Sequence, residues 1–191
     1  MTQKKRYALG LDVSTSCTGI CILDRDIEPD ATGSHIVLLD HEPFKKCKTM
    51  WDKADQMGRQ LTLIAVNHLI HADFEVFVEE ALLGFRPGLS SATTIASLLR
   101  FNGIVSYLSR NVFQVEPQFV SSSHARKVCG IKLQRTAAAG KSQKAQVFDH
   151  MSANDLKHVV WPLKKNGKII DGAGDATDAY VVARAGVLMN K

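Results

Sequence analysis

Apolar runs and apolar stripes alternate along the chain, and their order predicts its secondary structure. Three short apolar runs come first, over residues 7–13, 17–23 and 35–40, each bounded by polar residues. Runs of this length and composition predict β-strands, and the tight turn Ser14–Ser16 between the first two predicts a hairpin. The chain is therefore expected to begin with a meander of three antiparallel strands.

The middle of the chain alternates between helical and strand patterns. A helical apolar period over residues 50–71 gives way to a strand pattern over 74–81, and a helical period returns from Ser91 to Arg110. A short fifth strand is expected over residues 111–116, and Pro117 would end it.

The last third of the chain is mainly helical in pattern. Helices are predicted over residues 121–129, 141–151 and 175–188, with a basic loop over 131–140. The whole order predicts an α/β fold with a mixed five-stranded central sheet, three antiparallel strands followed by two parallel ones, and helices on both faces. No repeat or linker divides the sequence, so a single domain over residues 1–191 is expected.

Composition narrows the class of protein. The chain has 191 residues, of which 45% are hydrophobic and 23% charged, as in ordinary globular proteins. It is too short for a two-domain kinase, and it contains neither a long apolar run nor a signal peptide. Its four cysteines form no Cys-x-x-Cys pair, which argues against a zinc ribbon. We therefore expect an intracellular protein with reduced thiols and no membrane partner.

Basic residues are concentrated in one segment. Residues 120–168 contain ten Lys and Arg against two acids, whereas the rest of the chain is slightly acidic and the whole carries a net charge of +5. A concentrated basic segment suits a polyanion such as nucleic acid, and a solvated positive face is the alternative.

Four carboxylates stand at the ends of predicted elements. Asp12 ends the first strand, Glu79 ends the fourth, and Asp175 and Asp178 lie one turn apart on the last helix. One such Asp alone is often only a helix cap, but four that converge would suit a pair of Mg²⁺ or Mn²⁺ ions flanking a phosphodiester. Glu80 competes with Glu79, because neighbouring strand residues face opposite sides; Glu79 is preferred, since it directly follows the apolar run.

Three acidic motifs, in this order, resemble those of RuvC-type Holliday-junction resolvases. They are Leu9–Gly19, Val78–Glu80 and Asp175–Ala179, and the segment from Lys141 to Val147 is also similar to that family. The resemblance covers nearly the whole chain and implies an RNase H-like fold. It implies catalytic metal ligands at Asp12, Glu79, Asp175 and Asp178, with two Mg²⁺ ions that Mn²⁺ replaces. Lys144, with Lys141 as the alternative, resembles the lysine near the scissile phosphate.

The resemblance also implies an activity and partners. It implies a Mg²⁺-dependent endonuclease that resolves four-way DNA junctions by paired symmetric nicks and acts as a homodimer. The compact chain, with no helicase partner in cis, favours a stand-alone enzyme of a bacterial or virus-infected cell, with an organelle left open. Phe85 would stack on an unpaired base, or simply anchor its loop. Weaker alternatives are another RNase H-like nuclease acting on flaps, branched DNA or RNA–DNA hybrids, an actin-like nucleotide binder and a silent DNA-binding module. The expected DNA contacts are Phe85, Arg126, Lys127, Lys132, Arg135, Lys141 and Lys144.

Overall fold

The first three strands form the expected antiparallel meander. The computed structural model describes residues 6–30, 32–68, 73–81 and 91–190. In it β1 (Tyr7–Val13) pairs with β2 (Cys17–Asp24), which pairs with β3 (Ile36–Pro43). The hairpin register places Asp12 opposite Gly19. β3 extends beyond its predicted end at Asp40, because it remains paired with β2 as far as Pro43.

Two parallel strands complete the sheet. β4 (Phe74–Glu79) pairs parallel with β1, and β5 (Gln118–Val120) pairs parallel with β4, in the order β3-β2-β1-β4-β5. The predicted mixed five-stranded sheet is therefore confirmed. Because β1 and β4 run in the same direction, their last residues lie at the same edge of the sheet, which brings Asp12 and Glu79 to one end of the molecule.

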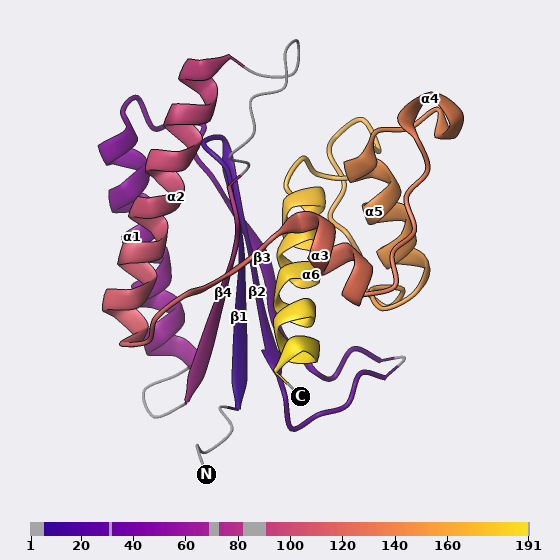
Figure 1. The fold of residues 1–191 in the computed structure, drawn as a ribbon, viewed down its shortest axis with the longest axis horizontal. Coiled ribbons are helices and arrows are strands. Elements are labelled where there is room, and N and C mark those ends of the chain that lie inside the picture. Colours follow the sequence, from indigo (N-terminus) through magenta and orange to yellow (C-terminus); the bar gives the residue numbers. More distant parts are fainter. Residues whose placement is uncertain (1–5, 31, 69–72, 82–90, 191) are drawn as a thin grey trace.

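Helices cover both faces of the sheet, as predicted (Figure 1). One layer consists of α1 (Met50–His68) and α2 (Ala92–Phe113). The opposite layer contains α6 (Ala173–Met189), with α3 (Ser122–Val128), the single turn α4 (Thr136–Ala139) and α5 (Gln143–Ala153) outside it. Among the described residues, no helix is both long and apolar enough to cross a membrane.

The predicted strand over residues 111–116 is wrong. α2 continues to Phe113 and ends at Gln114, whose left-handed backbone (φ 54°) stops the helix, and β5 begins only after Pro117. The extra helical turn packs Phe113 against Phe74, with ring centroids 5.3 Å apart, so burial outweighs the strand-like composition. The predicted loop over residues 131–140 also contains one helical turn, α4.

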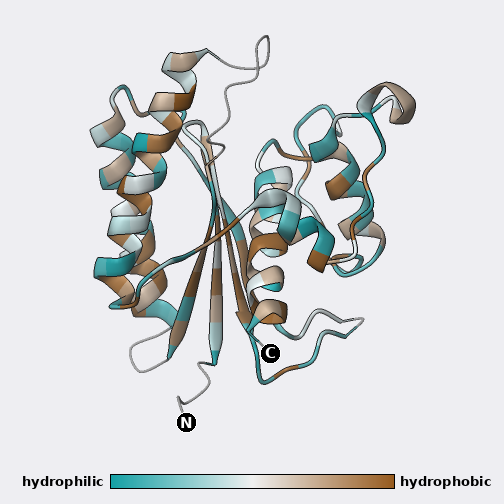
Figure 2. Cartoon of the chain, in the orientation of Figure 1, coloured by the Kyte–Doolittle hydropathy of each residue, from teal (hydrophilic) through white to brown (hydrophobic). Residues whose placement is uncertain are grey.

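Each face of the sheet has its own apolar core. Alternate residues of β1 face opposite layers, so that Leu9 and Leu11 pack towards α1 and α2 while Ala8 packs towards α6. Figure 2 shows the strands and the sheet-facing sides of the helices as largely hydrophobic. Gly10 and Asp12 lie two and four residues after Ala8 in β1, so they are on the same face of the sheet and point towards α6.

Glycines allow α6 to lie directly on the sheet. A Cβ atom at Gly10 would overlap the α6 backbone at Ala179 and Ala183, and one at Gly19 would overlap the backbone at Asp175. Within α6, a Cβ at Gly186 would overlap the ring of Phe77 in β4. These contacts fix the depth of α6 on the sheet along its whole length, including the turn that carries the acidic residues.

We predict that Gly10→Ala lowers the free energy of unfolding by about 1–3 kcal/mol, because the added methyl group meets backbone that cannot move aside. Urea denaturation measures this change. Gly103→Ala, compared at protein concentrations where the chain is monomeric, is the matched control, since apart from its own helix backbone nothing lies within 4 Å of its Cβ position and alanine favours the helix by up to about 1 kcal/mol. Equal stability of Gly10→Ala and the wild type would contradict the packing argument.

Candidate active site

Two of the predicted acids reach the site from adjacent parallel strands. Asp12 lies two residues after Gly10 in β1, so it is on the same face of the sheet as Gly10, which contacts α6. Glu79 lies two residues after Phe77 in β4, and Phe77 also contacts α6. Both side chains therefore point to the α6 side of the sheet. The negative charge of Glu79 acts on Asp12, which places the two carboxylates close together.

The other two acids come from the first turns of α6. The backbone at Asp175 lies against Gly19, the partner of Asp12 across the hairpin, so α6 begins directly beside the end of β1. Asp175 and Asp178 project from the same face of the helix. Their side chains are only 15% and 12% exposed, and that of Asp12 is 13% exposed, so three carboxylates lie largely out of water in one place.

Lys144, on the first turn of α5, provides the counter-charge. Its Nζ lies 3.8 Å from Asp12 Oδ2 and 3.3 Å from Asp178 Oδ2, and it donates a hydrogen bond to Asp175 Oδ1. Lys141, the alternative for this role, instead donates to Asp149 at 2.6 Å. The structure thus brings Lys144, and not Lys141, to the carboxylates.

Burial and mutual repulsion raise the pKa values of two acids at this site. Burial first, and then the charges of Glu79 and Asp178, raise the pKa of Asp12 well above its usual value. Burial and the charge of Glu79 likewise raise the pKa of Asp178 to about 6, against the opposing effect of Lys144. Burial disfavours the charged form of Lys144, but its hydrogen bond to Asp175 and the surrounding carboxylates raise its pKa overall. Anions held in this way attract cations strongly.

Of the two neighbouring glutamates, Glu79 rather than Glu80 lies at the site. Glu79 is half buried and electrostatically coupled to Asp12 and Asp178, whereas Glu80 is exposed and follows the end of β4. The alternation of side chains along β4 explains the difference, because it directs the side chain of Glu79 towards α6.

Two polar residues at this site were missed by the sequence analysis. Ser122 Oγ donates a hydrogen bond to Glu79 Oε1, and Asn102 Nδ2 donates to the backbone carbonyl of Glu79 at 2.9 Å. Ser122 belongs to a run of three serines whose pattern predicts only helix caps. Asn102 was the better signal, since it is a polar residue within the apolar pattern of α2 and is 5% exposed.

The donor chemistry fits divalent metal ions. Carboxylate oxygens are the ligands that Mg²⁺ and Mn²⁺ prefer. Burial first, and then the neighbouring acids, raise the pKa values of Asp12 and Asp178, so a bound cation would favour their ionised forms. Within the described ranges, however, no group of three or more His, Cys, Asp or Glu side chains is spaced to hold a metal ion. The ammonium group of Lys144 lies among three of the acids instead, so ions entering there would displace it.

The predicted DNA contacts have different positions relative to the site. Arg126 in α3 is half buried, and its charge lowers the pKa of Asp178, which places it beside the carboxylates. Lys127, Lys132 and Arg135 are exposed on α3 and the segment that follows it. Phe85 lies outside the described residues.

Comparison with known proteins identifies the fold. No protein-family model matches the chain, and no curated protein matches its sequence. Its structure is similar to that of Thermus thermophilus RuvC, with a TM-score of 0.57 at 11% identity over 96% of this chain and 95% of that one. It is also similar to T. thermophilus RuvC in complex with a Holliday junction substrate, with a TM-score of 0.59 at 9% identity over 96% and 94%. The chain therefore has the RNase H-like fold of RuvC, as the acidic motifs predicted.

We predict that Asp178→Asn stabilises the metal-free protein at neutral pH. The folded pKa of about 6 lies above the ordinary value of 3.8, so ionised Asp178 destabilises the folded state at pH 7 by on the order of 3 kcal/mol. The wild type should gain stability as the pH falls from 7 towards 4, while the variant should gain less, because only Asp12 among these two raised acids remains to be protonated. Urea denaturation in EDTA should show the variant as more stable at pH 7 and the difference closing near pH 4. A wild type that is the more stable at pH 7 would contradict the repulsion argument.

Proposed function

We propose that this chain is a metal-dependent endonuclease that resolves four-way DNA junctions. The observation that carries the proposal is the convergence of Asp12, Asp175 and Asp178 on Lys144 at one end of a RuvC-like sheet, with Glu79 coupled to the same group. T. thermophilus RuvC, whose fold this chain shares, forms a complex with a Holliday junction substrate. The common fold supports the proposal, and the acidic site adds chemistry that the fold alone does not supply.

The proposed reaction is hydrolysis of a phosphodiester. Asp12, Glu79, Asp175 and Asp178 would hold two Mg²⁺ ions, or Mn²⁺ in their place, and these ions would supply an activated water and charge stabilisation for the leaving 3′ oxygen. Lys144, displaced from the carboxylates, offsets the negative charge that grows on the phosphate. Arg126 adds a second positive charge beside the acids and attracts the DNA backbone. The products carry a 5′ phosphate and a 3′ hydroxyl.

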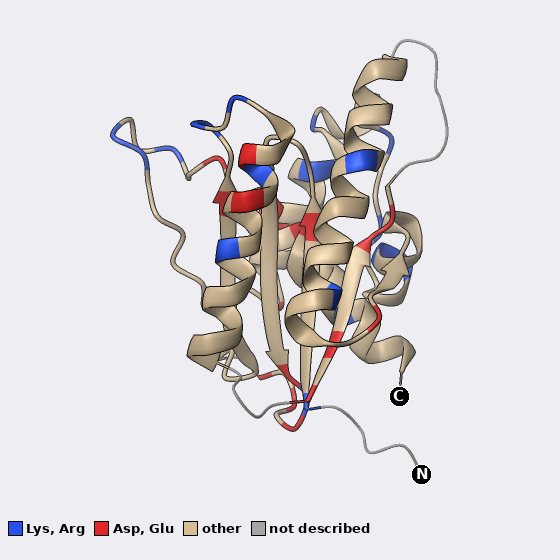
Figure 3. Ribbon diagram, turned by 90° about the vertical axis from the view of Figure 1, so that its left-hand side faces the viewer, with Lys and Arg blue, Asp and Glu red and all other residues tan. Residues whose placement is uncertain are grey.

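The distribution of positive charge supports DNA as the substrate. Figure 3 shows most Lys and Arg residues in the upper part of the molecule, towards the end of the sheet where β1 and β4 terminate. Lys127, Lys132 and Arg135 are exposed and free to contact phosphates, and Lys141 would exchange its partner Asp149 for one. Such contacts bind DNA of any sequence, so selection of a junction depends on shape.

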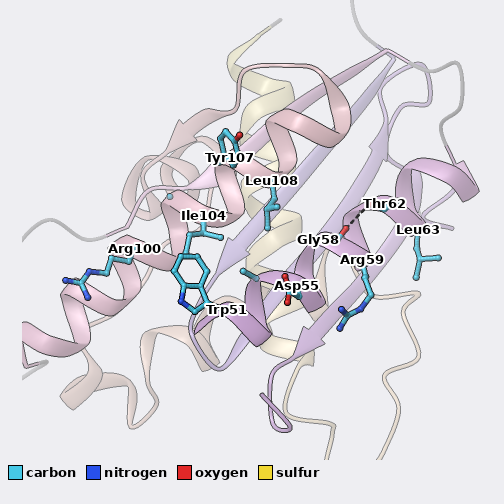
Figure 4. Close-up of a pocket in the computed structure, with 12 residues that line it drawn as sticks. Trp51, Asp55, Gly58, Arg59, Thr62, Leu63, Arg100, Ile104, Tyr107 and Leu108 are labelled. Atoms are coloured by element: carbon cyan, nitrogen blue, oxygen red, sulfur yellow. Dashed lines mark hydrogen bonds between the residues drawn. The ribbon is translucent and has the colours of Figure 1, made fainter. Parts of the chain in front are cut away.

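A homodimer completes the proposal, because paired nicks need two sites related by twofold symmetry. The α1–α2 layer offers a surface for a second copy, a groove of about 1000 Å³ lined mainly by apolar residues (Figure 4). Trp51 and Tyr107 at this groove are 71% and 61% exposed. The groove lies on the opposite side of the sheet from α6, so a copy bound there leaves both carboxylate sites open to DNA.

We predict that Asp12→Asn abolishes metal-dependent cleavage. Loss of an outer-shell partner alone costs metal sites roughly 10–100-fold, so loss of a ligand should cost at least about 100-fold. The assay compares a mobile four-way junction with linear duplex, a flap and an RNA–DNA hybrid, with and without Mg²⁺. Junctions cut by paired symmetric nicks are the expected result for the wild type.

Asp73→Asn is the matched control, since Asp73 is exposed at the opposite end of β4 and should leave cleavage unchanged. Cleavage by Asp12→Asn at the wild-type rate would reject the site. Cutting of flaps or hybrids in place of junctions would keep the site and assign the broader nuclease function.

We predict that the double substitution Trp51→Glu and Tyr107→Glu converts a dimer into a monomer, because two carboxylates would lose their hydration in a mainly apolar interface, a cost that Arg59 and Arg100 in the same groove would offset only in part. Sedimentation equilibrium measures the change in mass, and the monomer should nick junctions singly rather than in pairs. Val160→Glu is the control, since Val160 is 92% exposed and does not line the groove. A wild type that sediments as a monomer, or a variant that remains dimeric, would contradict this interface.

A further inference from the structure

The side chain of Glu79 is held by a residue from a different layer of the fold. Ser122, the first residue of α3, donates its hydroxyl proton to Glu79 Oε1. The backbone brings the two residues together, because Glu79 is paired with Val120 in the β4–β5 ladder and the amide of Glu80 donates to the Val120 carbonyl at 2.9 Å. Two residues after Val120, the chain turns into α3 directly beside Glu79.

A second contact fixes the backbone of Glu79 from the other face of the sheet. Asn102, buried in α2, donates its amide to the Glu79 carbonyl at 2.9 Å. Glu79 is therefore held at its carbonyl from the α2 side and at one carboxylate oxygen from the α3 side. Its second carboxylate oxygen, Oε2, accepts no hydrogen bond from the residues that the structure describes.

The hydroxyl of Ser122 is not needed to cap its helix. Ser121 is the N-cap of α3, and its side chain accepts the hydrogen bond from the amide of His124. Ser123, the next residue, is exposed. Of three consecutive serines, one caps the helix, one faces solvent, and one is directed at the carboxylate. The structural role of the run therefore does not account for the contact between Ser122 and Glu79.

We propose that Ser122 is a positioning residue that sets the metal affinity of the site by holding Glu79 Oε1 and leaving Oε2 to the ion. The inference rests on the proposed function, since it concerns the same carboxylates. A glutamate side chain has several rotamers, and a ligand that is already oriented loses less entropy when it binds. Ser122 also links the site to α3, which carries the predicted DNA contacts Arg126 and Lys127.

The decisive experiment measures Mn²⁺ binding to the full-length protein without DNA, by the loss of the free Mn²⁺ signal in electron paramagnetic resonance. Ser122→Ala should weaken Mn²⁺ binding about 10–100-fold, and the Mg²⁺ concentration for half-maximal cleavage should rise by a similar factor. Ser122→Thr, which keeps the hydroxyl, should restore most of the affinity. Ser123→Ala is the matched control and should behave as the wild type.

Further measurements separate the positioning role from a merely structural one. If Ser122 positions Glu79, unfolding in EDTA and metal-free junction binding should be the same for Ser122→Ala and Ser123→Ala. Ser122→Ala should then cause no further loss of Mn²⁺ affinity in a Glu79→Gln background, whereas a structural role would change stability and lower the affinity in both backgrounds. Mn²⁺ affinity of Ser122→Ala equal to that of the wild type overturns the inference. If the wild type binds Mn²⁺ and cuts no DNA, the proposed function fails while the Mn²⁺ measurement still decides the role of Ser122. A wild type that binds no Mn²⁺ overturns both.

Discussion

Repulsion among buried carboxylates is the constraint on which the rest of this structure depends. Asp12, Asp175 and Asp178 lie at most 15% exposed around a single ammonium group, and Glu79 adds further negative charge. Lys144 and the nearby Arg126 cannot neutralise four acids, and burial together with this repulsion raises the pKa values of Asp12 and Asp178. The surrounding packing must therefore hold together a group of charges that would separate if the chain were free to move.

The close packing of α6 on the sheet meets this requirement. Gly10 and Gly19 bring the helix backbone against β1 and β2, and Gly186 receives the ring of Phe77 from β4. α6 is buried on nearly all sides, unlike an amphipathic surface helix, so a shift of its first turn would disturb the core along its length. The same packing that stabilises the fold thus fixes two acids against a third, and stability and the geometry of the site are coupled.

The pattern of the sequence predicted most of the fold, because strand alternation and helical period are local. The three-strand meander, the two parallel strands and the helices on both faces are as expected. The four acids of the motifs also lie together around Lys144, while their catalytic roles remain predictions. The strand expected over residues 111–116 failed because packing of Phe113 on Phe74 extends α2, a tertiary contact that no local pattern records. Ser122 was missed for the same reason, since its partner Glu79 lies 43 positions away in the sequence.

The two helical layers differ in what they demand of the sequence. The α6 layer requires glycine where backbones touch, carboxylates at element ends and a lysine aimed at them, which are few positions in a long chain. Elsewhere in the core any residue of suitable size and hydrophobicity serves. A fold specified in this way tolerates extensive change, which explains similarity to RuvC structures over nearly the whole chain at only 9–11% identity. The α1–α2 layer carries none of these acids, so its outer surface is free to evolve for a partner while the chemistry on the far side of the sheet stays the same.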